Sequence, residues 1–430
     1  MIKTMALLCC LLFFSFSAFS QWQRITGQIQ NSVSCFTSMG TKLFAGTADG
    51  RLYLSTNYGV DWDSINTGRD SLNFNALAAV GANLVAGAIT NVSTPGWSGR
   101  GEQVFVSPDD GKHWNTVWGM NGLKWSGFYC FYAVDSFLLA GSGGIQYSKD
   151  TGKYWKDIGN PYYSGGGPRS ILVIDSTWFA GDYAMYGMSR STDSGRNWTL
   201  LSGENDTVSP GFTSSLAAIG EVLFAGTIAP ALGCAPWQCG VFRSLDYGNH
   251  WTVVNNGLTD ANVNCLFSKS TLLFAGAARN AVFVSADSGT HWKPFNEGFV
   301  VPDTGIYDLL SIADYLFAIT TTGQLYRRPL AQARASMPQS NLSYQNSLHI
   351  ISRSPSSRQV TVEYFLPSNA QTSLKVFNTR GKCISASDVQ RRPAGLQRHL
   401  LSIDAMRSGY FIIALYISNN FAESSTIVCR

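Results

Sequence analysis

Charge is scarce in this sequence, and its scarcity excludes several classes of protein. Asp, Glu, Lys and Arg make up 13% of the 430 residues, and the formal net charge is only +4. Nucleic-acid-binding domains carry a stronger basic excess, so no nucleic-acid partner is expected. The five histidines do not gather into a zinc site, and G-x-S-x-G and phosphate-loop motifs are missing. We therefore predict no metal, no cofactor and no recognisable set of catalytic residues.

Long apolar runs are also missing, except at the N-terminus. Residues 1–20 contain Lys3, then an apolar run over 6–16, then the small-residue pattern Ala18-Phe19-Ser20. The run is too short for a bilayer span, and the pattern is typical of a secretory signal. We predict a signal peptide over 1–20, cleaved before Gln21, with an uncleaved N-terminal anchor as the alternative. No later stretch predicts a membrane span.

Cysteines are few, and seven of the nine remain after the predicted cleavage. An odd number leaves at least one thiol unpaired. The segment CAPWQC predicts a disulfide between Cys234 and Cys239, which is typical of an oxidising compartment. Cys383 and Cys429 are candidates for a second pair. The other three lie in similar apolar strands and are expected to be buried thiols: Cys35, Cys130 and Cys265.

Glycine and aromatic residues are plentiful, and they occur in a repeat. The chain has 42 glycines, and Phe, Trp and Tyr make up 13% of it, which is typical of β-rich extracellular proteins when charges are few. The pattern Ser-x-Asp/Asn-x-Gly-x-x-Trp occurs six times, with steps of 52, 41, 43, 53 and 41 residues between tryptophans. An apolar run that ends in Ala-Gly precedes each copy, as at Gly46 and Gly276.

Each repeat unit predicts four short strands. In the sixth unit these are VNCLFS, TLLFAG, AVFVSA and HWKPFN. The eight-residue motif is then the turn between the third and fourth strands. Its Ser and Asp can bond to turn backbone, its Gly can take a positive φ, and its Trp can pack between sheets. Four-stranded units with a period in the forties predict an all-β propeller.

A seventh unit, around YLFAITTTGQLY from Tyr315, lacks the motif and its own fourth strand. The segment WQRITG at 22–27 matches the fourth strands that begin at Trp62 and Trp292. The N-terminal strand is therefore expected to complete the last sheet and remove its open edge. The predicted fold is a seven-bladed β-propeller over 21–330, closed by the N-terminal strand and followed by a small C-terminal β-sandwich.

The motif resembles the Asp-box, or BNR, repeat of sialidases, sortilin-type receptors, xyloglucanases and photosystem-assembly factors. The resemblance covers nearly all of residues 21–300. It implies a propeller, while the families that share it differ in function. It also implies a structural role for the motif residues: Asn57, Trp62, Asp109, Trp114, Asp150, Trp155, Asp193, Trp198, Asp246, Trp251, Asp287 and Trp292.

The C-terminal part has a different composition. Residues 331–350 are polar and predict a linker, whereas 351–430 carry ten Lys and Arg against four Asp and Glu and predict strands of a sandwich. VEYFLPSNAQTSLKVFNTRGK and SGYFIIALY resemble the C-terminal sorting domain of type IX secretion cargo in Bacteroidetes-like bacteria. Ser354-Pro355-Ser356 replaces the usual Pro-Asn-Pro entry. The resemblance implies the type IX secretion machinery as a partner and a secreted or outer-membrane-surface location; an ordinary basic sandwich is the alternative.

The long insertions share one face. Turns between second and third strands, and loops between blades, lie opposite the repeat turns. The insertions over 88–103 and 227–240 lie there, with 159–170 and 181–188 between them. Aromatic rings on glycine-rich loops suit sugar stacking or protein contact. The candidate ligand-binding residues are Trp97, Arg100, Trp125, Tyr162, Tyr163, Arg169, Tyr183, Tyr186 and Trp237.

These residues favour a secreted or cell-surface, non-catalytic propeller that binds a glycan or a surface protein. One alternative is a sialidase-like or xyloglucanase-like glycoside hydrolase, which needs two suitably spaced carboxylates. Asp49, Glu102, Asp182 and Glu204 lie near the loop face, but the arginine trio and Phe-Arg-Ile-Pro-like segment of sialidases are missing. A purely structural surface protein is the third hypothesis.

Overall fold

The computed structural model divides the chain into two units, Met1–Ser336 and Met337–Arg430. It describes residues 21–25, 29, 31–68, 73–94, 97–117, 128–134, 137–159, 167–182, 187–201, 210–229, 239–279, 282–299, 305–335, 349–354, 359–366, 370–378, 382–392, 395–402, 409–417 and 420–429.

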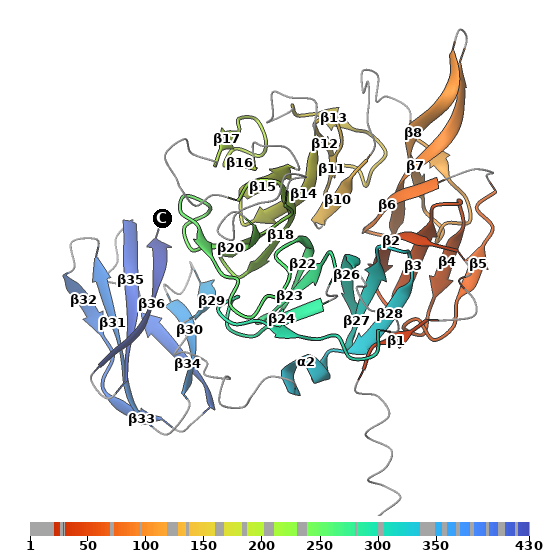
Figure 1. The fold of residues 1–430 in the computed structure, drawn as a ribbon. Coiled ribbons are helices and arrows are strands. Elements are labelled where there is room, and N and C mark those ends of the chain that lie inside the picture. Colours follow the sequence, from red (N-terminus) through yellow and green to blue (C-terminus); the bar gives the residue numbers. More distant parts are fainter. Residues whose placement is uncertain are drawn as a thin grey trace, which may run out of the picture. The chain divides into compact units, whose positions relative to one another are not determined.

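In its described residues the first unit has seven four-stranded antiparallel sheets (Figure 1). Six of these sheets consist of four consecutive strands. The seventh consists of the first strand of the unit and its last three strands. The sheets are β2–β5 (Val33–Met39, Lys42–Thr47, Leu52–Ser55, Asp63–Ile65), β6–β9 (Asn73–Val80, Asn83–Thr94, Trp97–Ser107, Asn115–Thr116), β10–β13 (Cys130–Val134, Phe137–Gly141, Ile145–Ser148, Lys156–Asp157), β14–β17 (Pro168–Ile174, Thr177–Asp182, Met188–Ser191, Thr199–Leu200), β18–β21 (Thr213–Ile219, Val222–Thr227, Gly240–Ser244, Thr252–Val253), β22–β25 (Val263–Lys269, Leu272–Ala277, Val282–Ser285, Lys293–Pro294) and β26–β28 with β1 (Ile306–Ile312, Tyr315–Thr320, Leu325–Pro329, Gln23–Arg24).

The first strands of the sheets form a ring. β2 contacts β6, and the contacts continue through β10, β14, β18, β22 and β26, which contacts β2 again. The second strands contain the Ala-Gly runs and are buried, with Phe44, Phe224 and Phe274 each 0% exposed. Apolar side chains of adjacent sheets pack together between them. Burial of this apolar surface between neighbouring sheets is therefore the main force that holds each sheet in place.

The repeat motif forms the turn between third and fourth strands in six sheets. In the sixth copy Ser285 Oγ donates to Asp287 Oδ1 at 2.8 Å and accepts from Gly289 N at 2.9 Å. The same carboxylate oxygen accepts from His291 N at 2.9 Å. Corresponding bonds recur in the other copies, with the amide oxygen of Asn57 in place of the carboxylate in the first.

The turn contains a left-handed residue that the motif does not predict. Gly289 has φ +82°, as expected, but Ser288 before it is also left-handed, at φ 55°. The same position is left-handed in the other five copies: Tyr58, Asp110, Thr151, Ser194 and Tyr247. A left-handed conformation costs a residue with a side chain roughly 1–2 kcal/mol. The Ser and Asp hydrogen bonds of the turn offset this cost.

The motif tryptophans lie between sheets. Trp114 is 6% exposed and belongs to a cluster with Phe44 of the preceding sheet and Phe105 of its own. Trp292 is 3% exposed and packs with Phe224 and Phe283 in the same manner. A buried indole removes a large apolar area from water, so each turn is anchored to two sheets by one side chain.

The N-terminal strand β1 pairs with β28 in antiparallel register. Trp22, just before it, is 1% exposed. Its backbone N donates to Glu297 O at 2.7 Å, and its indole Nε1 donates to Phe295 O at 2.6 Å. The beginning of the described chain is therefore held by residues that follow the sixth repeat.

The second unit has two antiparallel sheets in its described residues. One orders β29 (His349–Ser354), β30 (Gln359–Leu366) and β34 (Gly395–Ser402); the other orders β32 (Cys383–Ala386), β31 (Ala370–Asn378), β35 (Gly409–Ile417) and β36 (Asn420–Cys429), with β33 (Gln390–Arg392) paired to β31. Tyr364 Oη lies 3.1 Å from Thr372 Oγ1 and so links β30 to β31. The strands predicted for this region are therefore present, and they form two sheets.

The suggested second disulfide is wrong, because Cys383 is a free, exposed thiol. Cys383 pairs with Phe377 on β31, whereas Cys429 pairs with Gly409 on β35. Two strands, β31 and β35, lie between β32 and β36 in this sheet. At the usual strand spacing, the Cα atoms of Cys383 and Cys429 are therefore roughly 14 Å or more apart. A disulfide requires less than about 7 Å.

Within the segment predicted to be a linker, Ala331–Ala335 forms the short helix α2. Leu330 N donates to Asp314 O at 2.7 Å, and Arg328 Nε donates to Gln332 Oε1 at 2.9 Å. These bonds hold the segment against the end of β28. Residues 336–348 lie outside the described part of the chain.

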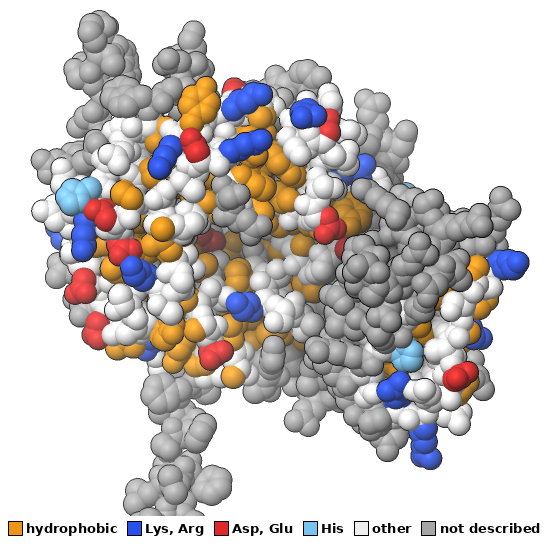
Figure 2. All heavy atoms as spheres, turned by 180° about the vertical axis from the view of Figure 1, so that it is seen from behind, with side chains coloured by type: hydrophobic (Ala, Val, Ile, Leu, Met, Phe, Trp, Pro, Cys, Tyr) orange, Lys and Arg blue, Asp and Glu red, His pale blue; other side chains and the backbone are white. Residues whose placement is uncertain are grey.

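Charged side chains are sparse and of mixed sign on the face seen in Figure 2. On the face seen in Figure 2, Lys and Arg side chains are interspersed with Asp and Glu, and hydrophobic side chains lie among them. Among the described residues, no helix has both the length and the apolar character that a membrane crossing requires.

Candidate ligand-binding site

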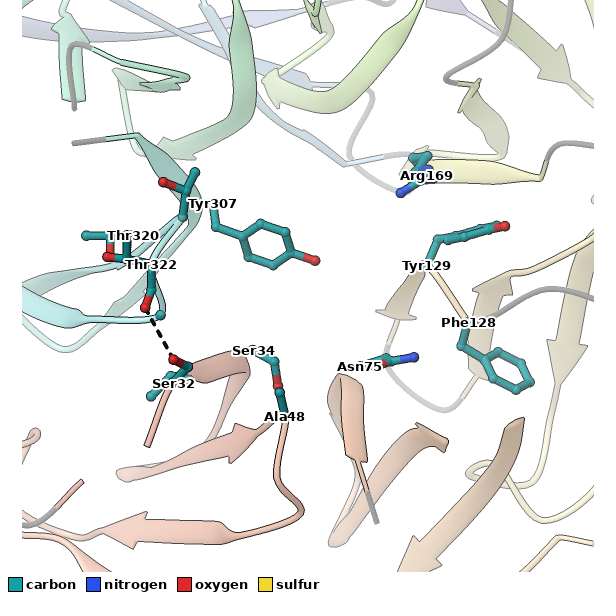
Figure 3. A pocket seen from close by; sticks show the side chains of 13 residues that line it. Ser32, Ser34, Ala48, Asn75, Phe128, Tyr129, Arg169, Tyr307, Thr320 and Thr322 are labelled. Atoms are coloured by element: carbon teal, nitrogen blue, oxygen red, sulfur yellow. Dashed lines mark hydrogen bonds between the residues drawn. The ribbon is translucent and has the colours of Figure 1, made fainter. Parts of the chain in front are cut away.

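A cavity of about 620 Å³ opens at one end of the ring of first strands (Figure 3). Its lining comes from the beginnings of β2, β6, β14 and β26, from Phe128 and Tyr129 before β10, and from the turn between β27 and β28. Turns between second and third strands lie at this end, opposite the repeat turns. The cavity is therefore on the face that the insertions single out.

Bulges in the first strands direct side chains into the ring. In β2, pairing with β3 steps from Val33 to Cys35 and leaves Ser34 outside the ladder. A bulge bends the strand and re-aims its extra side chain. Equivalent irregularities occur in five more first strands, at Asn75, Arg169, Ser214, Asn264 and Tyr307. Ser34, Asn75, Arg169 and Tyr307 line the cavity.

Some bulge side chains join the sheets to one another. Ser214 Oγ donates to Val263 O, and Asn264 Nδ2 donates to Ile306 O at 2.8 Å. Ser34 Oγ likewise donates to Phe74 O. Each bond connects one first strand to the next strand of the ring. The bulges therefore fix the ring and supply the lining of the cavity.

Arg169 is the charged residue of the described lining. Its guanidinium stacks on Tyr129, with Cζ 4.3 Å from the ring centroid. Tyr307 extends from the opposite wall with its hydroxyl directed into the cavity (Figure 3), and it is 53% exposed. Desolvation raises the pKa of the Tyr307 hydroxyl, as does the charge of Asp308, whereas Arg169 lowers it. The cavity thus offers one fixed cation between two aromatic rings.

A carboxyl group and three thiols lie behind this lining. Asp308 is enclosed by the ring although part of its surface stays accessible, and burial raises its pKa to about 7. A hydrogen bond of 2.8 Å from Leu309 N opposes that shift. Burial also raises the pKa of Cys35 and Cys130 to about 12 and that of Cys265 well above its ordinary value. The prediction of buried thiols is confirmed for Cys35 and Cys265, while Cys130 is half-buried; thiols of such high pKa are poor nucleophiles.

Backbone groups at the rim are already hydrogen-bonded. Val33 N donates to Gly323 O, and Thr321 N donates to Gly305 O, each at 2.9 Å. Gly323 has φ +76°, and a Cβ there would lie 2.5 Å from Ser32 Cβ, so the turn can meet the start of β2 only as glycine. Contacts to a ligand in the described lining are therefore left mainly to side chains.

Of the predicted ligand-binding residues, the structure places Arg169 in the cavity lining. Trp97 and Arg100 belong to β8, in the long hairpin with β7 (Figure 1), but their side chains lie outside the described part. The others fall outside the described residues: Trp125, Tyr162, Tyr163, Tyr183, Tyr186 and Trp237. Cys239 is disulfide-bonded; Cys234 is not described, so their pairing stays a prediction.

The candidate carboxylates are not part of the described lining. Asp49 accepts hydrogen bonds from Thr47 Oγ1, at 2.6 Å, and from Asn31. Asp182 is 1% exposed, and the side chains of Glu102 and Glu204 are outside the described part. In the portion of the chain that the structure describes, no three His, Cys, Asp or Glu side chains are grouped to hold a metal ion.

Sequence reasoning missed Asn75, Tyr129 and Tyr307. A usable signal was present, because the bulge residues of five of the first six sheets stand twelve positions before the glycine of their Ala-Gly run, as does Tyr129 in the remaining sheet. Ser34 and Gly46 illustrate the spacing, and the hydroxyl of Ser34 also contacts that glycine's carbonyl oxygen. The residue type at this position varies, with Ser34, Asn75 and Arg169 among its occupants, so no side-chain pattern marks it.

No protein-family model matches the chain, and no curated protein matches its sequence. The solved structure of YCF48 bound to the D1 peptide is similar with a TM-score of 0.55 and 15% identity, covering 72% of this chain and 96% of that one. A GH74 xyloglucanase from Xanthomonas campestris has a TM-score of 0.53 and 15% identity over 73% of this chain and 54% of that one. The WD40 β-propeller domain of Doa1 has a TM-score of 0.50 and 12% identity, covering 73% and 96%. The first unit is therefore a β-propeller.

Proposed function

We propose that this protein is a secreted or cell-surface, non-catalytic β-propeller that binds a glycan or a surface protein through the face containing the cavity. The composition of the cavity lining carries the proposal. It combines two tyrosine rings and one arginine with hydroxyl and amide side chains, and its described residues include no Asp or Glu. Glycoside hydrolysis needs paired carboxylates, whereas stacking and hydrogen bonding need only the groups present.

We further propose that the propeller has seven blades over 21–330, closed by the N-terminal strand. The seven four-stranded sheets, the cyclic contacts of their first strands and the pairing of β1 with β28 support this arrangement. We also assign the repeat turns to the Asp-box type, with structural motif residues. The support is that the Ser and Asp side chains bond within their own turns.

For export, we propose a signal peptide over 1–20, a linker over 331–350 and a type IX sorting domain over 351–430. The support is the sequence resemblance, together with a second unit of two sheets that begins at Met337. The type IX secretion machinery is then a partner, and the location is secreted or on the outer-membrane surface of a Bacteroidetes-like bacterium. The predicted loop residues, including Trp97 and Trp237 beside the Cys234–Cys239 staple, would extend the binding face.

The test is a glycan-array and polysaccharide-gel screen of the full mature chain, together with a screen for binding to intact cells, each with a Tyr307→Ala variant. Tyr154, which is 65% exposed in a repeat turn, supplies the matched control Tyr154→Ala. We expect Tyr307→Ala to lose binding, Tyr154→Ala to keep it, and no shortened sugar to appear. Release of shortened sugars would establish the glycoside hydrolase alternative. Absence of any glycan or cell-surface binding would leave the purely structural role.

A further inference from the structure

We infer that the cavity binds an acidic sugar, with Arg169 as the partner of the sugar's carboxylate. The inference rests on the proposed function, because it names the ligand class of the same site. Its starting point is the charge of the lining. Arg169 is the charged residue among the described lining residues, so a singly negative ligand group would be balanced there.

The geometry of Arg169 suits a carboxylate. A guanidinium presents a planar fork of N–H donors that matches the two oxygens of a carboxylate. Stacking on Tyr129, at 4.3 Å, holds the plane of this fork in a defined orientation. A fixed donor loses less conformational entropy on binding than a mobile one.

The rest of the lining favours a sugar over a peptide. A peptide usually adds to a sheet through free backbone groups, but here Val33 N and Thr321 N are already used within the rim. A sugar requires hydroxyl and amide partners and an aromatic surface for its apolar face. Asn75 and the exposed Thr321 and Thr322 provide the former, and Tyr307, opposite Arg169, provides the latter (Figure 3).

The experiment is calorimetric titration of the full mature chain with trimers of galacturonic, glucuronic and mannuronic acid. The methyl ester of each trimer keeps the rings and removes the charge. Arg169→Gln removes the cation, and Arg169→Lys keeps the charge without the fork. Arg279→Gln is the matched control, because Arg279 is exposed in the turn after β23, on the same face, outside the cavity lining. Thermal melting of each variant checks folding.

We expect at least one acidic trimer to bind and its ester to bind at least about tenfold more weakly. Arg169→Gln should weaken the acidic trimer about 10- to 100-fold, the effect of losing a charge-assisted pair. The affinity of Arg169→Lys for the acidic trimer should lie between those of Arg169→Gln and the unmodified protein. The affinity of Arg279→Gln should stay within about twofold of that of the unmodified protein.

Equal binding of acid and ester, or no effect of Arg169→Gln, would overturn the inference and leave the proposed function intact if Tyr307→Ala still abolishes glycan binding. Binding of a peptide with a free C-terminal carboxylate that depends on Arg169, without binding of any trimer, would replace the sugar with a peptide. Failure of every trimer and of the glycan and surface screen would reject both.

Discussion

The indole N–H of Trp22 donates to the carbonyl oxygen of Phe295 at 2.6 Å, across 273 positions of the chain. Trp292 makes the corresponding bond to Val254 O at 2.7 Å, one sheet earlier. The backbone N–H groups of the two tryptophans also donate to carbonyl oxygens at matching positions. Trp22 therefore holds β1 to its sheet as Trp292 holds β25, although no covalent continuity brings β1 there.

Trp22→Ala should lower the free energy of unfolding by about 3–5 kcal/mol, because it removes a buried indole at the junction of the two chain ends. Trp22→Phe keeps a ring but leaves Phe295 O without its donor, so a loss of about 1–3 kcal/mol is expected. Urea denaturation of the full chain measures both, with Trp292→Phe as the matched control. A change below about 1 kcal/mol for Trp22→Ala would mean that β1 contributes little to stability.

Asp287→Ala should cost about 1–2 kcal/mol, because His291 N and Ser285 Oγ lose their acceptor in a strained turn. Asp287→Asn should cost less than about 0.5 kcal/mol, since the amide oxygen of Asn57 fills the same place in the first copy. Chemical denaturation of the three proteins side by side is the measurement. If asparagine proves as harmful as alanine, charge rather than oxygen geometry maintains the turn.

Asp308→Asn should remove a pH-dependent loss of stability. The folded-state pKa of Asp308 is raised from 3.8 to about 7, so folding disfavours its ionised form. Stability from this group is complete below about pH 4, falls as the pH rises towards 7 and is constant above that. Between pH 4 and 8 the free energy of unfolding of the variant should increase relative to that of the unmodified protein, by up to about 4 kcal/mol.

Melting curves of the two proteins between pH 4 and 9 test this expectation. Asp314→Asn serves as the control, because Asp314 is exposed in the turn between β26 and β27. A difference between Asp308→Asn and the unmodified protein that does not vary with pH would show that the carboxyl of Asp308 is not the titrating group.

The thiols behind the cavity should resist a thiol reagent in the native protein. Burial raises the pKa of Cys35 and Cys130 to about 12, so almost no thiolate is present at pH 8. Cys383 is free and exposed, and it should be labelled within minutes. Mass-spectrometric mapping after brief treatment compares the sites within one sample. Labelling of Cys35 as fast as that of Cys383 would indicate that the ring opens readily.

The repeat made most of the propeller predictable. Ser285, Gly289 and Trp292 are residue types with strong preferences for a turn and the strand after it, so the sequence alone predicts the turn. The recurrence of these residues gives the period of the repeat. The left-handed Ser288 could not be predicted, because nothing in its side chain demands that conformation; the surrounding hydrogen bonds impose it. Helix α2 was missed because five residues give too little periodicity to detect.

The candidate site was predictable in its face but hardly in its residues. Strand alternation fixes which turns share an end, and that end holds the cavity. Tyr307 and Asn75 escaped notice because a bulge is a backbone event, and its extra residue obeys no side-chain pattern. Arg169 was found for a different reason, as part of a glycine-rich loop.

The bulges couple recognition to folding. Each contributes one side chain that belongs to neither the ladder nor the packed core, as at Asn75, Arg169 and Tyr307. Several of these positions also tie one first strand to the next, as Ser34, Ser214 and Asn264 do. A substitution at a bulge therefore acts on the lining of the cavity and on the joints of the ring at once, so a change of ligand in this scaffold is also a change of its framework.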